Sequence, residues 1–130
     1  MKKVLLVDDD PVANFLHEDL IKRCLMSEVE VANNGMEALD KINAGLEIKS
    51  FPDLILLDIN MPIMDGFEFL EAFDKIPEKP PVKIVILSSS ISPRDISSAQ
   101  KYNIEGYINK PLSFSKLQEA LYKPQYKAEG

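Results

Sequence analysis

The sequence predicts a doubly wound α/β sandwich, in which a parallel sheet of five strands is covered by helices on both faces. Solid apolar runs of four residues are typical of strands that are buried on both faces. Segments with helical spacing of apolar residues lie between these runs. Two weaker strand candidates bring the strand–helix alternations to five, the pattern of this fold class. The three strongest strand candidates are Val4–Val7, Leu54–Leu57 and Ile84–Leu87.

The first half of the chain is predicted to contain two strands and two helices. The strand Val4–Val7 is followed by a helix, on which His17 is expected to be a surface residue. The weaker strand Val29–Ala32 is expected nearer an edge of the sheet. A second helix begins at the capping pair Asn34 and Glu37. The apolar faces expected to be buried are Val12, Leu16, Leu20 and Cys24 on the first helix, and Ala38, Leu39, Ile42 and Leu46 on the second.

The second half repeats this alternation. Leu54–Leu57 precedes a helix that follows Asp65-Gly66, and Ile84–Leu87 precedes a helix with Ser92 as its N-cap. Pro93 at the first helical position and Asp95 in the first turn support that cap. The weaker strand Gly106–Ile108 comes next, and the last helix is capped by Ser113 and ends before Pro124. The apolar faces of the third and last helices are Phe69, Leu70 and Phe73, and Phe114, Leu117 and Leu121.

Length and composition limit the kind of protein. The 130 residues suit one domain, predicted over residues 1–123, with a frayed tail over residues 124–130. A net charge of −6 disfavours direct nucleic-acid binding, which needs a basic face. The apolar runs are too short to cross a membrane or to form a signal peptide. A single Cys24 excludes an internal disulfide, so we expect a cytoplasmic protein without a structural zinc site.

Polar side chains follow the strands at the points where the strands end. They are Asp8 to Asp10 after the first strand, Asp58 and Asn60 after the third, Ser88 to Ser90 after the fourth, and Asn109-Lys110-Pro111 after the fifth. Because right-handed crossovers place the carboxyl ends of parallel strands at one edge, these groups are expected in one shallow pocket. The pocket would hold three carboxylates, a hydroxyl and an ammonium group.

These carboxylates need a counter-charge. Two of them at ~4 Å repel each other by about 4 kcal/mol at an effective dielectric constant of 20. Lys110 offsets only part of this repulsion, so either a carboxylate takes up a proton or a divalent cation binds. Ligands that are all oxygen select a hard cation, and Mg²⁺ is the abundant one. A carboxylate nucleophile beside Mg²⁺, Lys110 and the Ser88 hydroxyl suits phosphoryl transfer that forms an acyl phosphate.

The chain resembles the receiver domain of two-component response regulators over nearly its whole length. The intervals of 30 residues from Asp58 to Ser88 and 22 residues from Ser88 to Lys110 also suit that family. The resemblance implies a flavodoxin-like three-layer sandwich with strand order 2-1-3-4-5. It is carried by Val4–Pro11, Asp53–Pro62, Asp65-Gly66, Ile84–Ser88 and Gly106–Pro111.

The resemblance also implies a role for each residue at the strand ends. Asp58 looks like the phosphoacceptor, and Lys110 looks like the phosphate-contacting lysine with a cis bond to Pro111. Ser88 and Tyr107 look like the switch pair that remodels the face made by the fourth helix, the fifth strand and the fifth helix. The residues that look like Mg²⁺ ligands are Asp8, Asp9, Asp58 and, through its backbone carbonyl, Asn60.

The implied function is a phosphoacceptor switch rather than a multiple-turnover enzyme. The expected partners are a sensor histidine kinase or a histidine phosphotransfer protein, and a downstream target protein. No effector segment follows the last helix, so we expect either a stand-alone, chemotaxis-regulator-like protein or an excised domain, as a monomer or a phosphorylation-dependent dimer.

Three other functions fit parts of the sequence. Asp8-Asp9-Asp10 also fits the signature of a haloacid-dehalogenase-type phosphatase, but that enzyme class needs further acidic residues after Lys110 and leaves Asp58 unexplained. A flavodoxin-like carrier needs Ser, Thr or Gly amides in its first loop, where three aspartates would repel phosphate. A docking module that works without phosphorylation would share the fold, and the intact set of polar residues argues against it.

Overall fold

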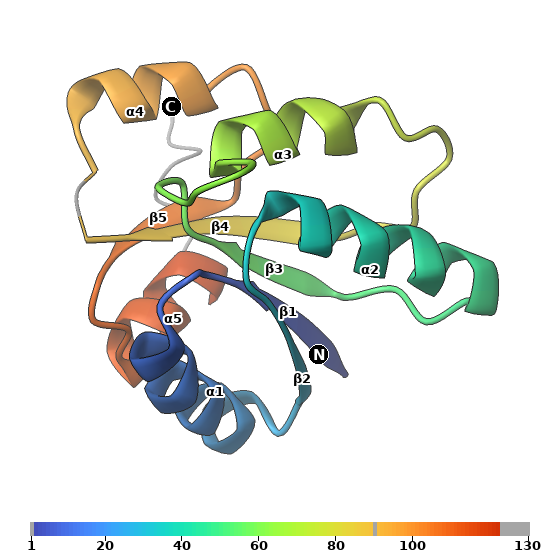
Figure 1. Cartoon of the computed structure of the whole chain (residues 1–130). Helices are drawn as coiled ribbons and strands as arrows, with labels where there is room; N and C mark the ends of the chain where they lie inside the picture. The colour runs from blue at the N-terminus through green and yellow to red at the C-terminus, as the bar shows by residue number, and fades with distance from the viewer. Residues whose placement is uncertain (1, 90, 123–130) are drawn as a thin grey trace.

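The computed structural model describes residues 2–89 and 91–122, in which strands and helices alternate along the chain (Figure 1). Each predicted strand and helix is present, and no strand end differs from the predicted one by more than one residue. The elements are β1 Lys3–Val7, α1 Pro11–Leu25, β2 Glu28–Ala32, α2 Gly35–Ile48, β3 Leu54–Leu57, α3 Gly66–Asp74, β4 Lys83–Ser88, α4 Pro93–Ala99, β5 Gly106–Asn109 and α5 Phe114–Tyr122.

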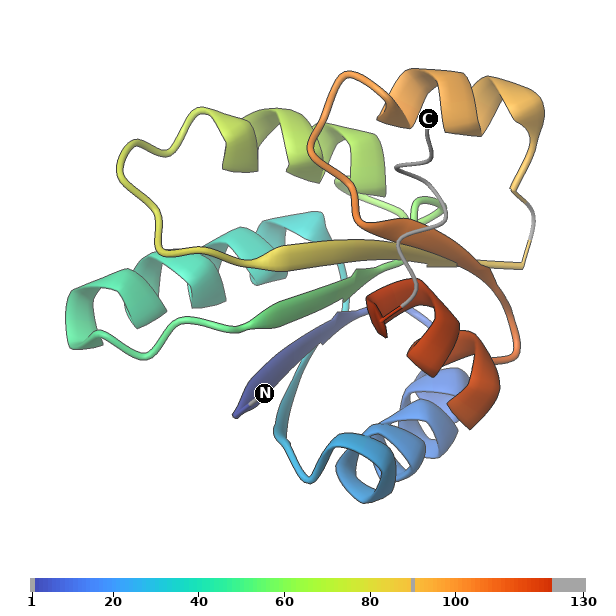
Figure 2. The same cartoon turned by 180° about the vertical axis from the view of Figure 1, so that it is seen from behind.

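The sheet has the predicted topology. Its strands are hydrogen-bonded in the order β2-β1-β3-β4-β5, and every pair is parallel. Helices α1 and α5 cover one face, and α2, α3 and α4 cover the other (Figures 1 and 2). The two weaker strand candidates, β2 and β5, form the edges of the sheet, as expected. This arrangement places the carboxyl ends of β1, β3 and β4 side by side at the centre.

The core lies on both sides of the sheet because successive side chains of a strand point to opposite faces. All four residues of β3 are buried. Leu54 and Leu56 pack on the face of α1 and α5, together with Leu117 and Leu121. Ile55 and Leu57 pack on the face of α2 and α3, together with the residues Ala38, Ile42, Phe69, Leu70 and Phe73. The prediction that the solid apolar runs form strands buried on both faces is therefore confirmed.

The predicted helix caps are present. Asn34 accepts a hydrogen bond from the Glu37 backbone N–H at 2.8 Å, although the Glu37 carboxylate reaches back to Asn33 rather than to Asn34. Ser92 and Asp95 form a reciprocal capping box, with Pro93 at the first helical position. The Ser113 hydroxyl accepts a hydrogen bond from the Lys116 backbone N–H at 3.2 Å. Pro124 lies outside the described residues.

The expected buried face of α1 is wrong in its first half. Val12 and Leu16 are 67% and 59% exposed, whereas Asn14, His17 and Ile21 are the buried residues of this helix. The physical reason is that the first turns of α1 lie against loops at the edge of the sheet, and the polar backbone groups of those loops need hydrogen-bond partners. Phe114, at the first position of α5, is likewise half-exposed rather than buried.

The domain boundary at residue 123 stays a prediction, because the tail at 124–130 lies outside the described residues. Among residues 2–89 and 91–122, no helix has the length and apolar character needed to cross a membrane.

Candidate functional site

Three loops at the carboxyl edge of the sheet bring Asp8, Asp58 and Lys110 together. Each backbone is fixed by a hydrogen bond that continues the strand pairing beyond the strand end. The N–H of Asp8 donates to Ala32 at 3.0 Å, and the N–H of Asp58 donates to Val7 at 2.9 Å. The N–H of Lys110 donates to the Ser88 carbonyl at 2.9 Å. The sheet itself therefore sets the relative positions of these three residues.

Lys110 pairs with both buried carboxylates. Its Nζ lies 2.6 Å from Asp8 Oδ2 and 3.2 Å from Asp58 Oδ2. The Asp8 and Asp58 side chains are almost completely buried, and that of Lys110 is only 16% exposed. A charge-assisted pair of this kind is stronger than one at the surface, because water screens it less. The predicted contact between Lys110 and the strand-end aspartates is therefore present.

Asp9 completes an acidic cluster with Asp8 and Asp58. One carboxylate oxygen from each of the three residues lies within 4.8 Å of the other two. Asp9 is exposed, so the cluster is open to solvent on one side. With one lysine against three carboxylates, the cluster keeps a net negative charge, and its donor atoms are all oxygen. This donor set fits Mg²⁺, which prefers carboxylate and water ligands. The backbone carbonyl of Asn60 as a further ligand stays a prediction.

Neighbouring charges and burial change the pKa values of Asp58 and Lys110. Burial raises the pKa of Asp58 above its ordinary value, and the charge of Asp8 adds to this rise, against the opposing effects of the Asn60 N–H and Lys110. Burial alone would lower the pKa of Lys110, but the hydrogen bond to Asp8 and the charges of Asp58 and Asp8 outweigh burial and raise it. Lys110 is therefore a permanent cation at neutral pH, whereas Asp58 holds its charge at a cost.

The raised pKa of Asp58 predicts how the metal-free protein responds to pH. The folded state binds the Asp58 proton more tightly than the unfolded chain, whose pKa is near 3.8. The contribution of Asp58 to the free energy of unfolding therefore rises as the pH falls through the folded pKa towards 3.8, and it is constant below that. Denaturant titrations of the wild type and Asp58→Asn in the presence of a chelator measure this difference. A wild-type-minus-variant difference that does not change with pH would contradict the shift.

The loop after β3 depends on Gly66. A Cβ atom at this position would lie 2.6 Å from Ile59 Cα and 2.8 Å from the Asp58 carbonyl oxygen. The Gly66 N–H donates to the Ile59 carbonyl at 3.1 Å, and Asp65 forms a capping box with Glu68. The Asp65-Gly66 pair thus starts α3 and lets its first turn press against the backbone of the residue next to Asp58. The peptide bond from Lys110 to Pro111 is cis, as expected.

Of the two predicted switch residues, Ser88 contacts the loop after β3, and Tyr107 lies further back along the sheet. Ser88 is fully buried at the end of β4, and Asn60 Nδ2 donates to its hydroxyl at 3.5 Å. Tyr107 on β5 is half-buried and pairs in register with Ile86, two residues before Ser88. Side chains two residues apart on a strand share a face of the sheet, so Ser88 and Tyr107 lie on the face covered by α4.

Sequence reasoning missed Asn14, and its prediction that His17 is a surface residue is wrong. Both are buried on α1, and both contact the loops that carry the site residues. Asn14 Nδ2 donates to the Asp8 carbonyl at 2.8 Å, and His17 Nε2 accepts from the Leu112 N–H at 3.4 Å. The spacing of Asn14, His17 and Ile21 at three and four residues is itself a helical face. Because two of its members are polar, a search for apolar stripes passes over it.

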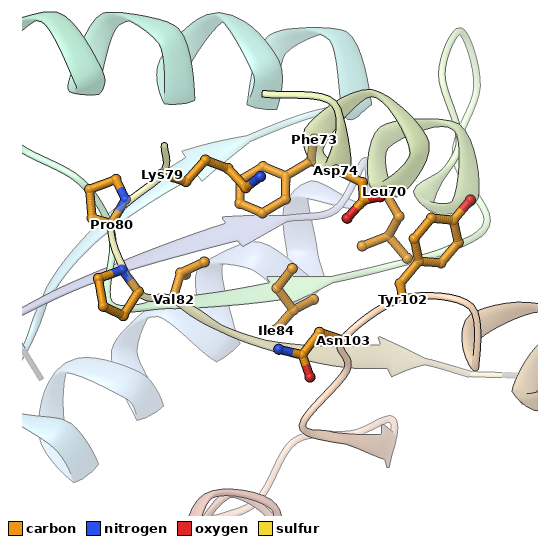
Figure 3. Close-up of a pocket in the computed structure, with 10 residues that line it drawn as sticks. Leu70, Phe73, Asp74, Lys79, Pro80, Val82, Ile84, Tyr102 and Asn103 are labelled. Atoms are coloured by element: carbon orange, nitrogen blue, oxygen red, sulfur yellow. The ribbon is translucent and has the colours of Figure 1, made fainter. Parts of the chain in front are cut away.

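A separate pocket lies away from the acidic cluster. It has a volume of about 380 Å³ and lies near the amino ends of β4 and β5, between α3 and the loop before β5 (Figure 3). Lys79, at its rim, donates to the Ile76 carbonyl at 2.7 Å and lies over the Phe73 ring at 5.0 Å. The pocket shares no lining residue with the acidic cluster, so it is not part of the predicted site.

Known proteins match this chain over nearly its whole length. The family model of the response regulator receiver domain matches residues 4–122. The chemotaxis protein CheY of Listeria monocytogenes is 36% identical over 124 residues, which are 95% of this chain and 98% of that protein. A solved two-component response regulator from Cytophaga hutchinsonii matches with a TM-score of 0.85 and 30% identity, covering 98% of both chains.

Some similar proteins are longer than this chain. The protein-glutamate methylesterase/protein-glutamine glutaminase of Archaeoglobus fulgidus is 38% identical over 111 residues, which are 84% of this chain but only 30% of that protein. The similarity therefore concerns the part of such relatives that this chain spans.

Proposed function

The chain belongs to the family of response regulator receiver domains of two-component signalling, and from this premise we propose that it is a phosphoacceptor switch whose acceptor is Asp58. The observation that carries the proposal is the position of Lys110 Nζ, which lies within ion-pair distance of both Asp8 and Asp58. A cation there suits a site that receives an anionic phosphoryl group, because transfer depends mainly on positioning and charge stabilisation.

In the proposed reaction, a carboxylate oxygen of Asp58 attacks the phosphorus atom of a phosphohistidine donor. An O–P bond forms, the P–N bond to the donor imidazole breaks, and the product is an acyl phosphate. Lys110 would hold a phosphoryl oxygen, and the 3.2 Å distance from its Nζ to Asp58 Oδ2 supports this role. The Ser88 hydroxyl would donate to another oxygen, and its contact with Asn60 on the neighbouring loop supports this role.

Asp8, Asp9 and Asp58 would hold Mg²⁺, with the Asn60 carbonyl as a further ligand. Bound there, Mg²⁺ supplies positive charge that offsets the repulsion between the carboxylates and the incoming phosphoryl group. The proposed Mg²⁺ site is supported by the closeness of the three carboxylates and by the burial of two of them beside a single lysine. Asp8 keeps its orientation through the hydrogen bond that its Oδ1 accepts from the Asp10 N–H at 3.0 Å.

We further propose that phosphorylation is read out through Ser88 and Tyr107. A phosphoryl group on Asp58 would draw the Ser88 hydroxyl towards it, and the half-buried Tyr107 ring would move into the space beside β4. The surface that changes is made by α4, β5 and α5, and it would contact a downstream target protein or a second copy of the chain. The same-face position of Ser88 and Tyr107 supports this coupling.

Labelling with a small phosphodonor tests the proposal. Phosphoramidate with Mg²⁺ is expected to add one phosphoryl group to the protein, at Asp58, and the bond is expected to be cleaved by hydroxylamine, as an acyl phosphate is. Intact-protein mass spectrometry and peptide mapping measure this. Labelling of another residue would overturn the assignment. Repeated turnover of a phosphomonoester would instead support the phosphatase alternative, and a lack of any labelling would support a docking module that works without phosphorylation.

The apolar outer face of α1 supports the hypothesis that the natural phosphodonor is a protein. Val12, Phe15 and Leu16 are 67%, 75% and 59% exposed. They lie in the first turns of α1, directly after Asp8 to Asp10, and so beside the acidic cluster. An apolar surface next to a polar site is typical of a protein contact. We therefore propose that a sensor histidine kinase or a histidine phosphotransfer protein docks on these residues during transfer.

Phe15→Ala is expected to separate protein donors from small donors. The phosphodonor is a phosphorylated histidine phosphotransfer domain that labels the wild type. Its rate of phosphotransfer should fall by about tenfold, because an aromatic side chain that becomes buried at an interface contributes about 1–2 kcal/mol. Labelling by phosphoramidate should be unchanged. Ile48→Ala is the control, because Ile48 is 73% exposed on the distant end of α2. Equal loss with both donors in Phe15→Ala would argue against docking.

The remaining expectations follow from the same proposal. The protein would act in the cytoplasm as a signalling switch rather than as a multiple-turnover enzyme, without direct contact to nucleic acid and without insertion into a membrane. Its net charge of −6 agrees with the absence of a nucleic-acid partner.

A further inference from the structure

A buried polar face of α1 connects the two loops that carry the charged residues of the site. Asn14 and His17 are both about 95% buried, at positions where an apolar residue would ordinarily pack. Asn14 Nδ2 donates to the Asp8 carbonyl at 2.8 Å. His17 Nε2 accepts from the Leu112 N–H at 3.4 Å, across 95 residues of sequence. One helix face therefore contacts the loop after β1 and the loop after β5.

The contact of His17 lies close to Lys110 in the chain. Leu112 follows Lys110 by two residues, and the N–H of Lys110 is itself fixed to the Ser88 carbonyl. Besides the hydrogen bonds that Lys116 Nζ donates to the carbonyls of Asn109 and Pro111, at 2.9 and 3.1 Å, the short segment that carries the lysine is held by two backbone contacts, to β4 before it and to α1 after it. The loss of either contact gives the segment more freedom, and the ammonium group then has a wider range of positions relative to Asp8 and Asp58.

The chemistry of His17 fits this contact only in one protonation state. An imidazole accepts a hydrogen bond through Nε2 when it is neutral and its proton lies on Nδ1. His17 Nδ1 and the Asn14 Oδ1 are both buried and make no hydrogen bond among the described residues. The contact of Nε2 with the Leu112 N–H is therefore the observation that assigns the proton to Nδ1.

The charges around His17 favour the neutral form. Burial lowers its pKa below the ordinary value, and the positive charge of Lys110 lowers it further. Asp8 and Asp10, in the loop after β1, act in the opposite direction and are outweighed. A neutral imidazole at the working pH therefore agrees with its role as an acceptor for Leu112.

We propose that His17 is a positioning residue for Lys110: its neutral imidazole accepts the Leu112 N–H and so fixes the segment that holds the lysine against the acidic cluster. The proposal concerns a residue outside the family resemblance described above, and it rests on the proposed function of Lys110 in phosphoryl transfer. It predicts that His17 affects the rate of phosphorylation without touching the phosphoryl group or the metal ligands.

Two spectroscopic readouts test the contact without any activity measurement. ¹⁵N NMR of the imidazole in the wild-type protein is expected to show a neutral ring at pH 7 with the proton on Nδ1. The Leu112 amide is expected to be protected from hydrogen exchange, and this protection should be lost in His17→Leu and kept in His17→Gln, whose side-chain carbonyl also accepts a hydrogen bond. A proton on Nε2 in the wild type would overturn the proposal, whether or not any variant folds.

Kinetics tests the consequence for Lys110. In His17→Leu, labelling by phosphoramidate at saturating Mg²⁺ is expected to slow by about threefold to tenfold, in line with the loss of one hydrogen bond. Mg²⁺ affinity should be nearly unchanged, and His17→Gln should recover most of the rate. In a Lys110→Ala background, His17→Leu should slow labelling no further, because the histidine acts through the lysine.

Ile21→Val is the matched control for a loss of stability. Ile21 lies on the same buried face of α1, one turn after His17, and packs in the core on the side of α5. Its truncation is expected to lower stability by about 1 kcal/mol without changing the labelling rate of the folded protein. A wild-type rate in His17→Leu, or an equal slowing in both backgrounds, would overturn the positioning role. If the wild type itself is not labelled at Asp58, the proposed function fails, and the two spectroscopic readouts still decide the His17 contact.

Discussion

Asp58→Asn is expected to abolish phosphoryl labelling and to stabilise the metal-free protein at neutral pH. Labelling is lost because an amide is not a nucleophile towards phosphorus. Stability rises because burial and the charge of Asp8 disfavour the Asp58 carboxylate, as its raised pKa indicates. Two measurements are needed, the incorporation of phosphate from phosphoramidate and the denaturant midpoint in the presence of a chelator. Loss of labelling together with retained or increased stability separates a chemical role from unfolding.

Asp10→Asn is the control for this variant. Asp10 is the N-cap of α1, where its side chain accepts hydrogen bonds from Val12 and Ala13. Asparagine caps a helix about as well as aspartate does, so the change removes the same charge from the same edge of the sheet without removing the cap. Asp10→Asn is expected to be labelled at a rate close to that of the wild type. If it also abolished labelling, the effect of Asp58→Asn would reflect the charge of the edge and not the acceptor.

Asp9→Asn is expected to weaken Mg²⁺ binding several-fold. Mg²⁺ at about 100 times its dissociation constant should raise the free energy of unfolding of the wild type by about 2.7 kcal/mol, since it binds the folded state only. A tenfold weaker affinity in Asp9→Asn would remove about 1.3 kcal/mol of this stabilisation. Asp9 is exposed, so the metal-free variant should unfold like the wild type. Isothermal titration calorimetry and denaturation with and without Mg²⁺ measure both quantities.

The charge control again distinguishes a ligand from a distant charge. Asp10→Asn removes one negative charge at the residue next to Asp9, but the carboxylate that it removes is not in the acidic cluster. Its Mg²⁺ affinity should therefore change far less than that of Asp9→Asn. Equal affinities in the wild type and Asp9→Asn would refute the role of Asp9 as a ligand and would leave Asp8 and Asp58 as the side chains of the site.

The sheet and its edge were predictable because their signals are local. Four consecutive apolar residues in β3 can be buried only with cover on both faces, and Leu54–Leu57 is buried throughout. Once all strands are parallel, the residue after each strand end lies at one edge, which is why Asp8, Asp58 and Lys110 were expected to meet. The contacts of Lys110 with both aspartates confirm that closeness. The chemical role of each residue stays a prediction that the variants above test.

The inner face of α1 was not predictable from apolar spacing. Val12 and Leu16 continue the period set by Leu20 and Cys24, yet they point outwards, and Asn14 and His17 point inwards. The partners that decide this are the Asp8 carbonyl and the Leu112 N–H, which lie in loops. Their positions depend on the tertiary fold, and Leu112 is 95 residues away from His17 in the chain. Helical periodicity identifies the faces of a helix, but it does not show which face is buried against the polar backbone groups of loops.

The two opposite faces of α1 have different proposed roles, although their residues are close together in the sequence. Val12, Phe15 and Leu16 face outwards, whereas Asn14 and His17 face inwards and donate to or accept from the backbone of the two loops. If Val12, Phe15 and Leu16 are replaced by the corresponding residues of another receiver domain, we expect the protein to accept phosphate from that receiver's partner. The rate of labelling by a small phosphodonor should stay at the wild-type value. On the proposed docking, about one and a half turns of α1 would set which partner the protein binds.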